Sequence, residues 1–187
     1  MLKRFTNFLD SYQQQYLEWY EAADSETKRH WVNAFIQVMD YRDKNPKIVQ
    51  KWKEYDYEFK NNTDNGNMHI DLLDGRTINF WNIRVEKDKT TAKLQKGGAR
   101  REKYYGANIF QNEVQGNARN LFSEMMLKIN EAGYDIILSV HDEVVVEVDL
   151  DKADQAEEDI NRIMTTAPEW CDIPLACEAV RMERYTK

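Results

Sequence analysis

The sequence predicts an α+β protein, in which a helical portion precedes an antiparallel sheet packed with helices. Three observations predict it. Residues 1–62 carry apolar side chains at helical spacing and contain almost no Gly or Pro. Short β-branched and aromatic runs follow, with the alternation that is typical of strands. A long amphipathic pattern over 105–132 then leads into a second pair of apolar runs. We therefore expect two portions, residues 1–62 and 63–187.

The composition is typical of a folded chain without a membrane span. The 187 residues carry a net charge of -7, with 42% hydrophobic and 12% aromatic residues, so disorder over most of the length is excluded. No apolar run reaches the length of a membrane span, and no signal-peptide pattern occurs, which predicts a cytoplasmic setting. The two cysteines, Cys171 and Cys177, do not have metal-ligand spacing.

Three helices are expected in the first portion. The first covers 2–22, the second is capped by Asp24 or Ser25, and the third starts at the helix-initiating pair Asn45-Pro46. Aromatic and apolar side chains recur along each helix at helical spacing and are expected in the core. They include Trp19, Trp31, Phe35, Val38, Trp52, Tyr55 and Phe59.

The second portion opens with a hairpin and a basic segment. Residues 68–81 alternate around Asp74-Gly75, which predicts a hairpin with a two-residue turn. Residues 84–103 hold eight Lys or Arg against three Asp or Glu, a local charge of +5. Because this segment lacks sustained periodicity, we expect a flexible basic connector.

The helix predicted over 105–132 has two different faces and ends at Gly133. Its apolar face is expected to comprise Phe110, Val114, Ala118, Leu121, Phe122, Met125 and Ile129. Long amides and a guanidinium, at one-turn spacing, suit the recognition of acceptors on bases and sugars, although such a face can also be merely solvated. This polar face carries Asn108, Gln111, Asn112, Gln115 and Arg119.

A second hairpin is predicted over 134–148, with His141, Asp142 and Glu143 between its two apolar runs. None of the three is a residue that favours turns, and adjacent carboxylates repel each other unless a cation lies between them. The pattern therefore indicates a divalent cation site, with a solvated polar turn as the alternative. Transfer of a phosphoryl group to nucleic acid needs acids that hold Mg²⁺ and cationic or amide groups that hold the backbone.

Five segments in chain order together resemble family A DNA polymerases, the DNA polymerase I type, from about residue 40 to 187. The sequence around His141-Asp142-Glu143 is similar to the third conserved motif of that family, and Leu73-Asp74-Gly75-Arg76 resembles its Leu-Pro-Ser-Gly-Arg hairpin. Tyr105-Gly106 with 111–119 resembles the preceding helix of phage members, and Tyr41-Arg42 with 45–52 resembles a fingers segment. Residues 173–178 with Arg184-Tyr185 resemble the C-terminal end of the family.

The resemblance implies roles for individual residues in a helical fingers portion and a palm portion. Asp142 would bind the catalytic Mg²⁺ ions with Glu143 as an auxiliary acid. His141 would contact the primer terminus or its minor groove, and Gln115 would follow the minor groove near the newly formed pair. The remaining DNA-binding positions that it implies are Gln111, Asn112 and Arg119 on the helix, with Arg76, Arg100 and Arg101 along the template–primer backbone.

Two elements of that family are missing from this sequence: the first motif, which supplies the other metal-binding aspartate, and the helix that holds the deoxynucleoside triphosphate. The chain is therefore expected to be the C-terminal part of a polymerase, either a fragment or one piece of a split enzyme. A second polypeptide would complete the two-metal site, and the isolated chain would be inactive. If the protein is phage-encoded, it would act in the cytoplasm of a host bacterium.

A different class of function remains open. The chain could be a non-catalytic module that retains the polymerase palm fold and binds DNA or a partner protein. The retained Asp142 and Glu143 favour the polymerase, but loss of a motif is also what decay would produce. A nuclease is a weaker alternative, because no second acidic cluster has suitable spacing.

Overall fold

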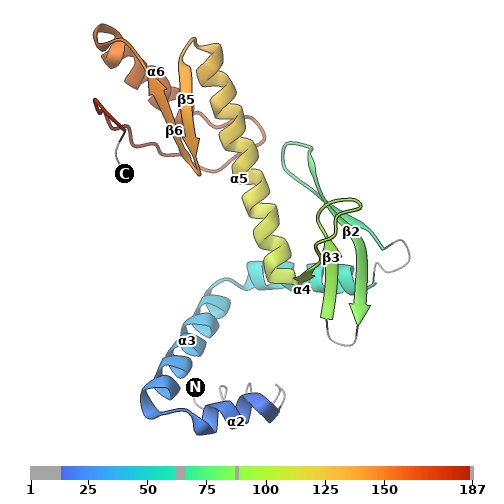
Figure 1. Cartoon of the computed structure of the whole chain (residues 1–187). Helices are drawn as coiled ribbons and strands as arrows, with labels where there is room; N and C mark the ends of the chain where they lie inside the picture. The colour runs from blue at the N-terminus through green and yellow to red at the C-terminus, as the bar shows by residue number, and fades with distance from the viewer. Residues whose placement is uncertain (1–13, 62–65, 87–88, 186–187) are drawn as a thin grey trace. The chain divides into compact units, whose positions relative to one another are not determined.

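The computed structural model describes residues 14–61, 66–86 and 89–185 (Figure 1). Helices and antiparallel sheets are both present, which confirms the α+β class. The chain divides into two compact units, Met1–Tyr57 and Glu58–Lys187, so the boundary falls inside a helix and not in the loop that follows it. Among the described residues, no helix combines the length and the apolar composition that crossing a bilayer requires.

The first unit is helical and contains α2 (Gln14–Ala22), α3 (Ser25–Lys44) and most of α4 (Pro46–Asn61). The Asp24 carboxylate accepts a hydrogen bond from the Thr27 amide at 2.8 Å, which confirms Asp24 as the cap of α3. The start of α4 at Pro46 is also as predicted. The first half of the expected helix over 2–22 lies outside the described residues.

The expectation that the aromatic stripes are buried is only partly confirmed. Phe35 is buried, with Tyr20, Val32 and Met39 packed around it. In contrast, the side chains of Trp19, Trp31 and Val38 are 58%, 37% and 49% exposed. A helix buries only the part of its apolar stripe that a neighbouring element covers, and periodicity does not reveal how wide that cover is.

The second unit contains a four-stranded antiparallel sheet in the order β1-β2-β3-β4. The strands are β1 (Met68–Asp71), β2 (Thr77–Glu86), β3 (Lys89–Lys93) and β4 (Glu102–Tyr104). The expectation of an irregular connector over 84–103 was therefore wrong. Thr90 and Ala92 are buried, while Thr91 and Lys93 are only half-buried. This short alternation is enough for a strand once β2 and β4 pair with it.

Three aromatic rings form the core beneath this sheet. Phe59, near the end of α4, lies edge-on to Phe80 with 4.9 Å between ring centroids, and Phe80 lies edge-on to Tyr104 at 5.1 Å. Phe59 and Phe80 are at most 1% exposed. Edge-to-face pairs of this kind are favourable beyond the area that they bury. Burial, together with the charge of Glu102, raises the pKa of Tyr104 to about 12.

The long helix α5 (Gly106–Glu131) follows the sheet. At its end, Gly133 has a φ of +88° and donates to the Asn130 carbonyl, while the Tyr134 amide donates to the Ile129 carbonyl. This pair of bonds is the Schellman termination that glycine permits. The strands β5 (Asp135–Val140) and β6 (Glu143–Glu147) then form a two-stranded antiparallel sheet, which is followed by η1 (Leu150–Lys152) and α6 (Ala153–Thr165).

Candidate active site

The turn between β5 and β6 contains only two residues, His141 and Asp142. Val140 pairs with Glu143 across the hairpin, and His141 has a φ of +55°. A two-residue turn with positive φ at its first position is the type that glycine normally occupies. An L-residue in that conformation costs on the order of 1–3 kcal/mol. The hairpin therefore gives up stability to place an imidazole beside a carboxylate at its tip.

The two acids of this hairpin have different environments. Asp142 is exposed, and within the described residues its carboxylate takes no hydrogen bond or ion pair. Glu143 is half-buried, and its carboxylate accepts a hydrogen bond from the Tyr185 hydroxyl at 3.3 Å. Burial and the Glu143 charge raise the pKa of Tyr185, so the phenol remains a donor to Glu143. Asp142 is thus accessible to a ligand, whereas the C-terminal tail holds Glu143 in place.

The oxygen donors at the turn are of the type that Mg²⁺ prefers. Two adjacent carboxylates, one exposed and one half-buried, supply them. The described part of the chain contains no group of three or more His, Cys, Asp or Glu side chains positioned to hold a metal ion. The donor set thus fits a hard divalent cation in kind, and two carboxylates are fewer ligands than a two-metal site needs.

A polar stripe, comprising Gln111, Gln115 and Arg119, runs along the N-terminal half of α5. All three side chains are exposed, and the two amides form no hydrogen bond to the rest of the described chain. The Arg119 guanidinium lies 5.8 Å from the centre of the Phe122 ring. Asn112 is half-buried beside the stripe. The stripe therefore presents two amides and a cation to any ligand that approaches this side of the helix.

The polar stripe continues the face of α5 that is buried further along. Starting at Gln111, positions 115, 118, 122, 125 and 129 recur at alternating intervals of four and three residues, so they share one side of the helix. Phe122, Met125 and Ile129 are buried on this side, and β5 and α6 both contact α5. The predicted apolar face was therefore right for its C-terminal half only, since Val114 is 50% exposed and Ala118 is exposed.

The β5–β6 turn lies near the polar stripe. β5 runs back along α5 from the C-terminal end of the helix (Figure 1). Its six residues span ~20 Å, which equals the rise of ~13 helical residues, so the turn reaches the level of about Arg119. The turn and the C-terminal end of the polar stripe therefore lie at a similar level along α5.

Three asparagines of α5 have structural roles that the sequence did not reveal. Asn108, expected on the polar face, instead accepts from the Tyr105 amide at 2.8 Å and donates to the Lys103 carbonyl at 3.0 Å, which secures the start of α5. Asn117 accepts from the Leu73 amide at 2.9 Å, and Asn120 donates to the Asp74 carboxylate at 2.8 Å. Amides at helical spacing look alike in sequence whether they are solvated or bonded, so no sequence signal separates these roles.

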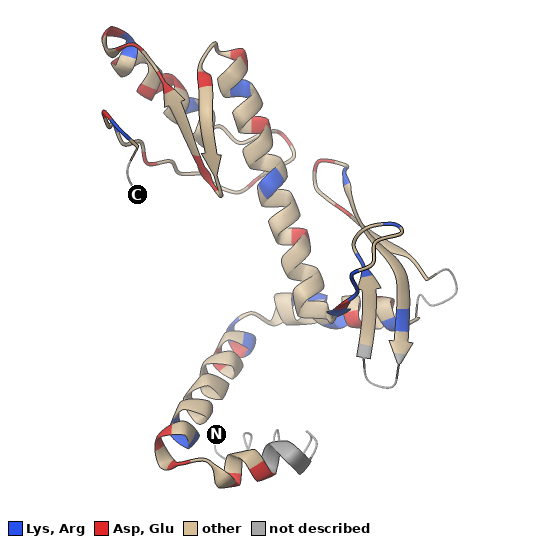
Figure 2. Ribbon diagram, viewed as in Figure 1, with Lys and Arg blue, Asp and Glu red and all other residues tan. Residues whose placement is uncertain are grey.

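Lys and Arg are spread along the ribbon of both units (Figure 2). The three arginines expected along a nucleic-acid backbone differ in their contacts. The Arg76 guanidinium pairs with Asp74 inside the β1–β2 turn. Arg101 is turned into the sheet, where its Nη1 donates to the Asn82 carbonyl at 2.7 Å and to Thr91 at 3.2 Å. Arg100 is 88% exposed and forms an ion pair with Glu102 at 2.8 Å. Arg100 is thus the most accessible of the three.

Comparison with known proteins finds two DNA polymerases. The chain is 26% identical over 133 residues to a DNA polymerase of Bacillus phage SP02, which covers 66% of this chain and 20% of that protein. It is 30% identical over 119 residues to DNA polymerase I of Aquifex aeolicus, covering 57% of this chain and 21% of that protein. No family model and no solved structure matches. The chain spans about a fifth of the length of these relatives, and the similarity supports a relationship to DNA polymerases.

Proposed function

We propose that this chain is the part of a family A DNA polymerase that carries Asp142 as a metal-binding carboxylate and α5 as the helix against the primer–template. The observation that carries the proposal is the strained two-residue turn, which leaves Asp142 exposed at the tip of the hairpin. The similarity of the chain to two DNA polymerases supports the same proposal. Template-directed nucleotidyl transfer from deoxynucleoside triphosphates is the reaction that we assign.

Each residue near the turn has a defined part in this proposal. Asp142 would hold the Mg²⁺ ions, which neutralise charge that develops on the transferring phosphate. Glu143, fixed by Tyr185, is the auxiliary acid, and His141 contacts the primer terminus. Gln115 follows the minor groove, where acceptor atoms are common to all base pairs.

The remainder of the DNA contacts would come from groups with less defined roles. Gln111, Asn112 and Arg119 extend the helix contact along the duplex, and Arg100 binds the template–primer backbone. We propose that Arg76 and Arg101, which the fold already engages, act through their positive charge more than through direct contact. The second metal-binding carboxylate and the triphosphate-binding helix come from polypeptide outside this sequence, as a partner chain.

A second candidate function is a non-catalytic module that binds DNA or a partner protein. The specific observation in its favour is that the described residues contain no cluster of three metal-ligating side chains. Such a module would use the polar stripe and Arg100 but would not require Asp142.

One experiment separates the two functions. The tagged chain is purified from its native source with whatever polypeptide accompanies it, and primer extension is measured with Mg²⁺ and all four deoxynucleoside triphosphates. We expect extension by the assembly and none by the chain alone. Extension at normal rates by the chain alone would refute the need for a partner. An assembly that binds primer–template but does not extend it would support the non-catalytic module.

A further inference from the structure

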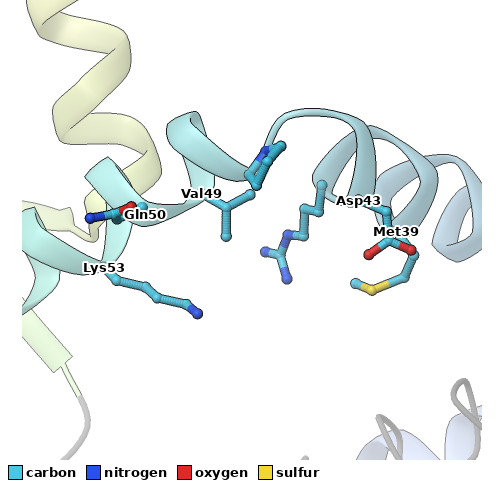
Figure 3. A pocket seen from close by; sticks show the side chains of 7 residues that line it. Met39, Asp43, Val49, Gln50 and Lys53 are labelled. Atoms are coloured by element: carbon cyan, nitrogen blue, oxygen red, sulfur yellow. The ribbon is translucent and has the colours of Figure 1, made fainter.

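The C-terminal tail, residues 178–185, makes a defined contact with the candidate active site, because one of its side chains bonds to Glu143. A hollow in the first unit is less informative. It has a volume of about 620 Å³ and lies where α3 ends and α4 begins (Figure 3). Its lining side chains come from both helices, and nothing in the described residues selects an occupant for this open surface. The tail therefore carries the inference that follows.

The tail is held by few contacts. It contains no helix or strand, and every side chain from Glu178 to Arg184 is exposed. Within the described residues, its backbone forms no hydrogen bond with the backbone of the rest of the chain. Two of its side chains, Arg181 and Tyr185, form polar contacts there. These two side chains therefore determine where the tail lies.

Arg181 anchors the tail to α6. Its Nη1 donates to the Asp154 carboxylate at 2.6 Å, and its Nε donates to the Glu157 carboxylate. The two acids are three positions apart, so they lie on one side of the helix and a single planar guanidinium can bond to both. A surface ion pair stabilises a fold only slightly, but two bonds to one guanidinium fix its position. The anchor thus serves to place the tail.

Tyr185 makes the second contact of the tail. Its hydroxyl donates to Oε2 of Glu143 at 3.3 Å, whereas Oε1 of that carboxylate has no partner within the described residues. Tyr185 comes four positions after Arg181, so the chain between them spans at most ~14 Å. Because a short tether raises the effective concentration of the group that it carries, Arg181 keeps the phenol within reach of Glu143.

We propose that Tyr185 and Arg181 are positioning residues for Glu143: the phenol holds one carboxylate oxygen and leaves the other for the reacting groups, and Arg181 holds the phenol in place. This inference rests on the function proposed above, in which Glu143 is the auxiliary acid. It adds that the tail, anchored on α6, sets the orientation of an acid beside the β5–β6 turn. A carboxylate without this bond would rotate and would occupy the productive orientation for less of the time. Turnover should then fall while substrate binding stays the same.

The test measures primer extension by the assembled complex with Tyr185→Phe, with Arg181→Gln and with both. Tyr185→Phe should lower kcat about tenfold, the loss typical of removing a partner that orients a reactive ligand, with the KM for deoxynucleoside triphosphate and the thermal midpoint unchanged. Arg181→Gln should cause a smaller loss, because Tyr185 can still reach Glu143. The combined variant should lose no more than Tyr185→Phe alone, since both act through one contact. Arg162→Gln, which removes another ion pair of α6, is the matched control and should extend normally.

A second measurement does not depend on activity. In the full chain labelled with ¹³C at the glutamate carboxyl carbons, the Glu143 resonance is identified by its absence from Glu143→Gln. We expect this resonance to shift in Tyr185→Phe and in Arg181→Gln, and to stay in place in Arg162→Gln. Because it is recorded on the chain alone, it tests the contact even if no assembly extends a primer.

Several results would overturn the positioning role. They are a normal kcat in Tyr185→Phe, a fall in its thermal midpoint that accompanies the lost turnover, losses that multiply in the combined variant, and a Glu143 resonance that does not move. Failure of this proposal is distinguishable from failure of the proposed function. Normal extension by Tyr185→Phe alone would contradict only the role of the tail, whereas normal extension by Asp142→Ala would contradict the proposed catalytic site itself.

Discussion

The second unit contains two hairpin turns that each carry an aspartate, and they are built in opposite ways. In the β1–β2 turn, glycine takes the positive φ: Gly75 has a φ of +83°. Asp74 is 11% exposed and accepts hydrogen bonds from Arg76 and Asn120. In the β5–β6 turn, His141 takes the positive φ, and Asp142 is exposed without a partner in the described chain.

The difference indicates that the first turn stabilises the fold, and it supports our proposal that the second turn presents a carboxylate to a ligand. At the first turn, the Asp74 carboxylate accepts from Arg76 and Asn120, the Leu73 amide donates to Asn117, and the glycine removes the backbone strain. The second turn keeps the backbone strain, and no described residue bonds to its Asp142 carboxylate. Strain held at an exposed turn is typical of functional sites. The contrast predicts that substitutions in the first turn change stability and substitutions in the second change activity.

The largest expected effect is that of Asp142→Ala on primer extension by the assembled complex. Loss of the metal ligand that we propose at Asp142 would remove several kcal/mol of transition-state stabilisation, so extension should fall about a thousandfold or more. DNA binding and the thermal midpoint should stay near those of the parent. Asp151→Ala, at another exposed acid of the same unit, is the matched control and should extend normally. Normal extension by Asp142→Ala would place the metal site elsewhere.

Next in size is the effect of Asn120→Ala on stability. The Asn120 side chain is buried, and its loss leaves the Asp74 carboxylate without a donor from α5. We expect a fall of about 1–3 kcal/mol in the free energy of unfolding, measured by urea denaturation. Asn130→Ala, at an exposed position on the same helix, should change it by no more than about 0.5 kcal/mol. An unchanged free energy of unfolding in Asn120→Ala would show that the hydrogen bond from Asn120 to Asp74 does not stabilise the first turn.

Smaller effects on the free energy of unfolding are expected when glycine is introduced at one turn and removed at the other. The two substitutions should change this free energy in opposite directions. His141→Gly relieves a positive φ and should raise the free energy of unfolding by about 0.5–1 kcal/mol. Gly75→Ala forces an L-residue into the same region and should lower it by about 1 kcal/mol, with no steric clash because nothing lies within 4 Å of the added carbon. Thermal unfolding of both variants compares the turns directly, and equal signs would contradict the contrast between them.

The smallest expected effect is in the acid dependence of stability. Burial acts to raise the pKa of Asp74, but hydrogen bonds from the Arg76 side chain and backbone outweigh it and hold the pKa below its usual value of 3.8. Because the folded pKa is depressed, the contribution is present above the unfolded value and is lost as pH falls through the folded one. Asp74→Asn should therefore flatten the loss of stability between about pH 5 and pH 2 in urea titrations. If stability falls with pH in the same way in Asp74→Asn and in the parent, the ion pair between Asp74 and Arg76 contributes little to stability.

Local signals in the sequence predicted local structure. The cap at Asp24, the start of α4 at Pro46 and the termination at Gly133 each depend on one residue and its nearest neighbours, and each is as expected. The prediction of a two-residue turn at Asp74-Gly75 was wrong about the length of the loop. Leu72 pairs with Arg76, so the loop holds three residues and Gly75 ends it, because a type I turn followed by a left-handed glycine also suits this sequence.

Contacts between distant segments could not be predicted. The strands β3 and β4 exist because β3 pairs with both β2 and β4, and because Arg101 bonds to the carbonyls of Asn82 and Thr91. A periodicity test detects neither. Likewise, the sequence placed Asn120 on no particular side of α5, whereas the β1–β2 turn buries it. The candidate site was predicted through His141, Asp142 and Glu143, but the different environments of the two acids depend on Tyr185, 42 positions away.

A double variant that replaces the β5–β6 turn itself, His141→Gly with Asp142→Asn, separates backbone strain from catalysis. Unfolding free energy and primer extension by the assembled complex are measured on the same preparation. We predict that this variant is more stable than the parent and does not extend a primer. A variant that loses stability, or that still extends the primer, would contradict the claim that this turn is strained in order to present a catalytic carboxylate.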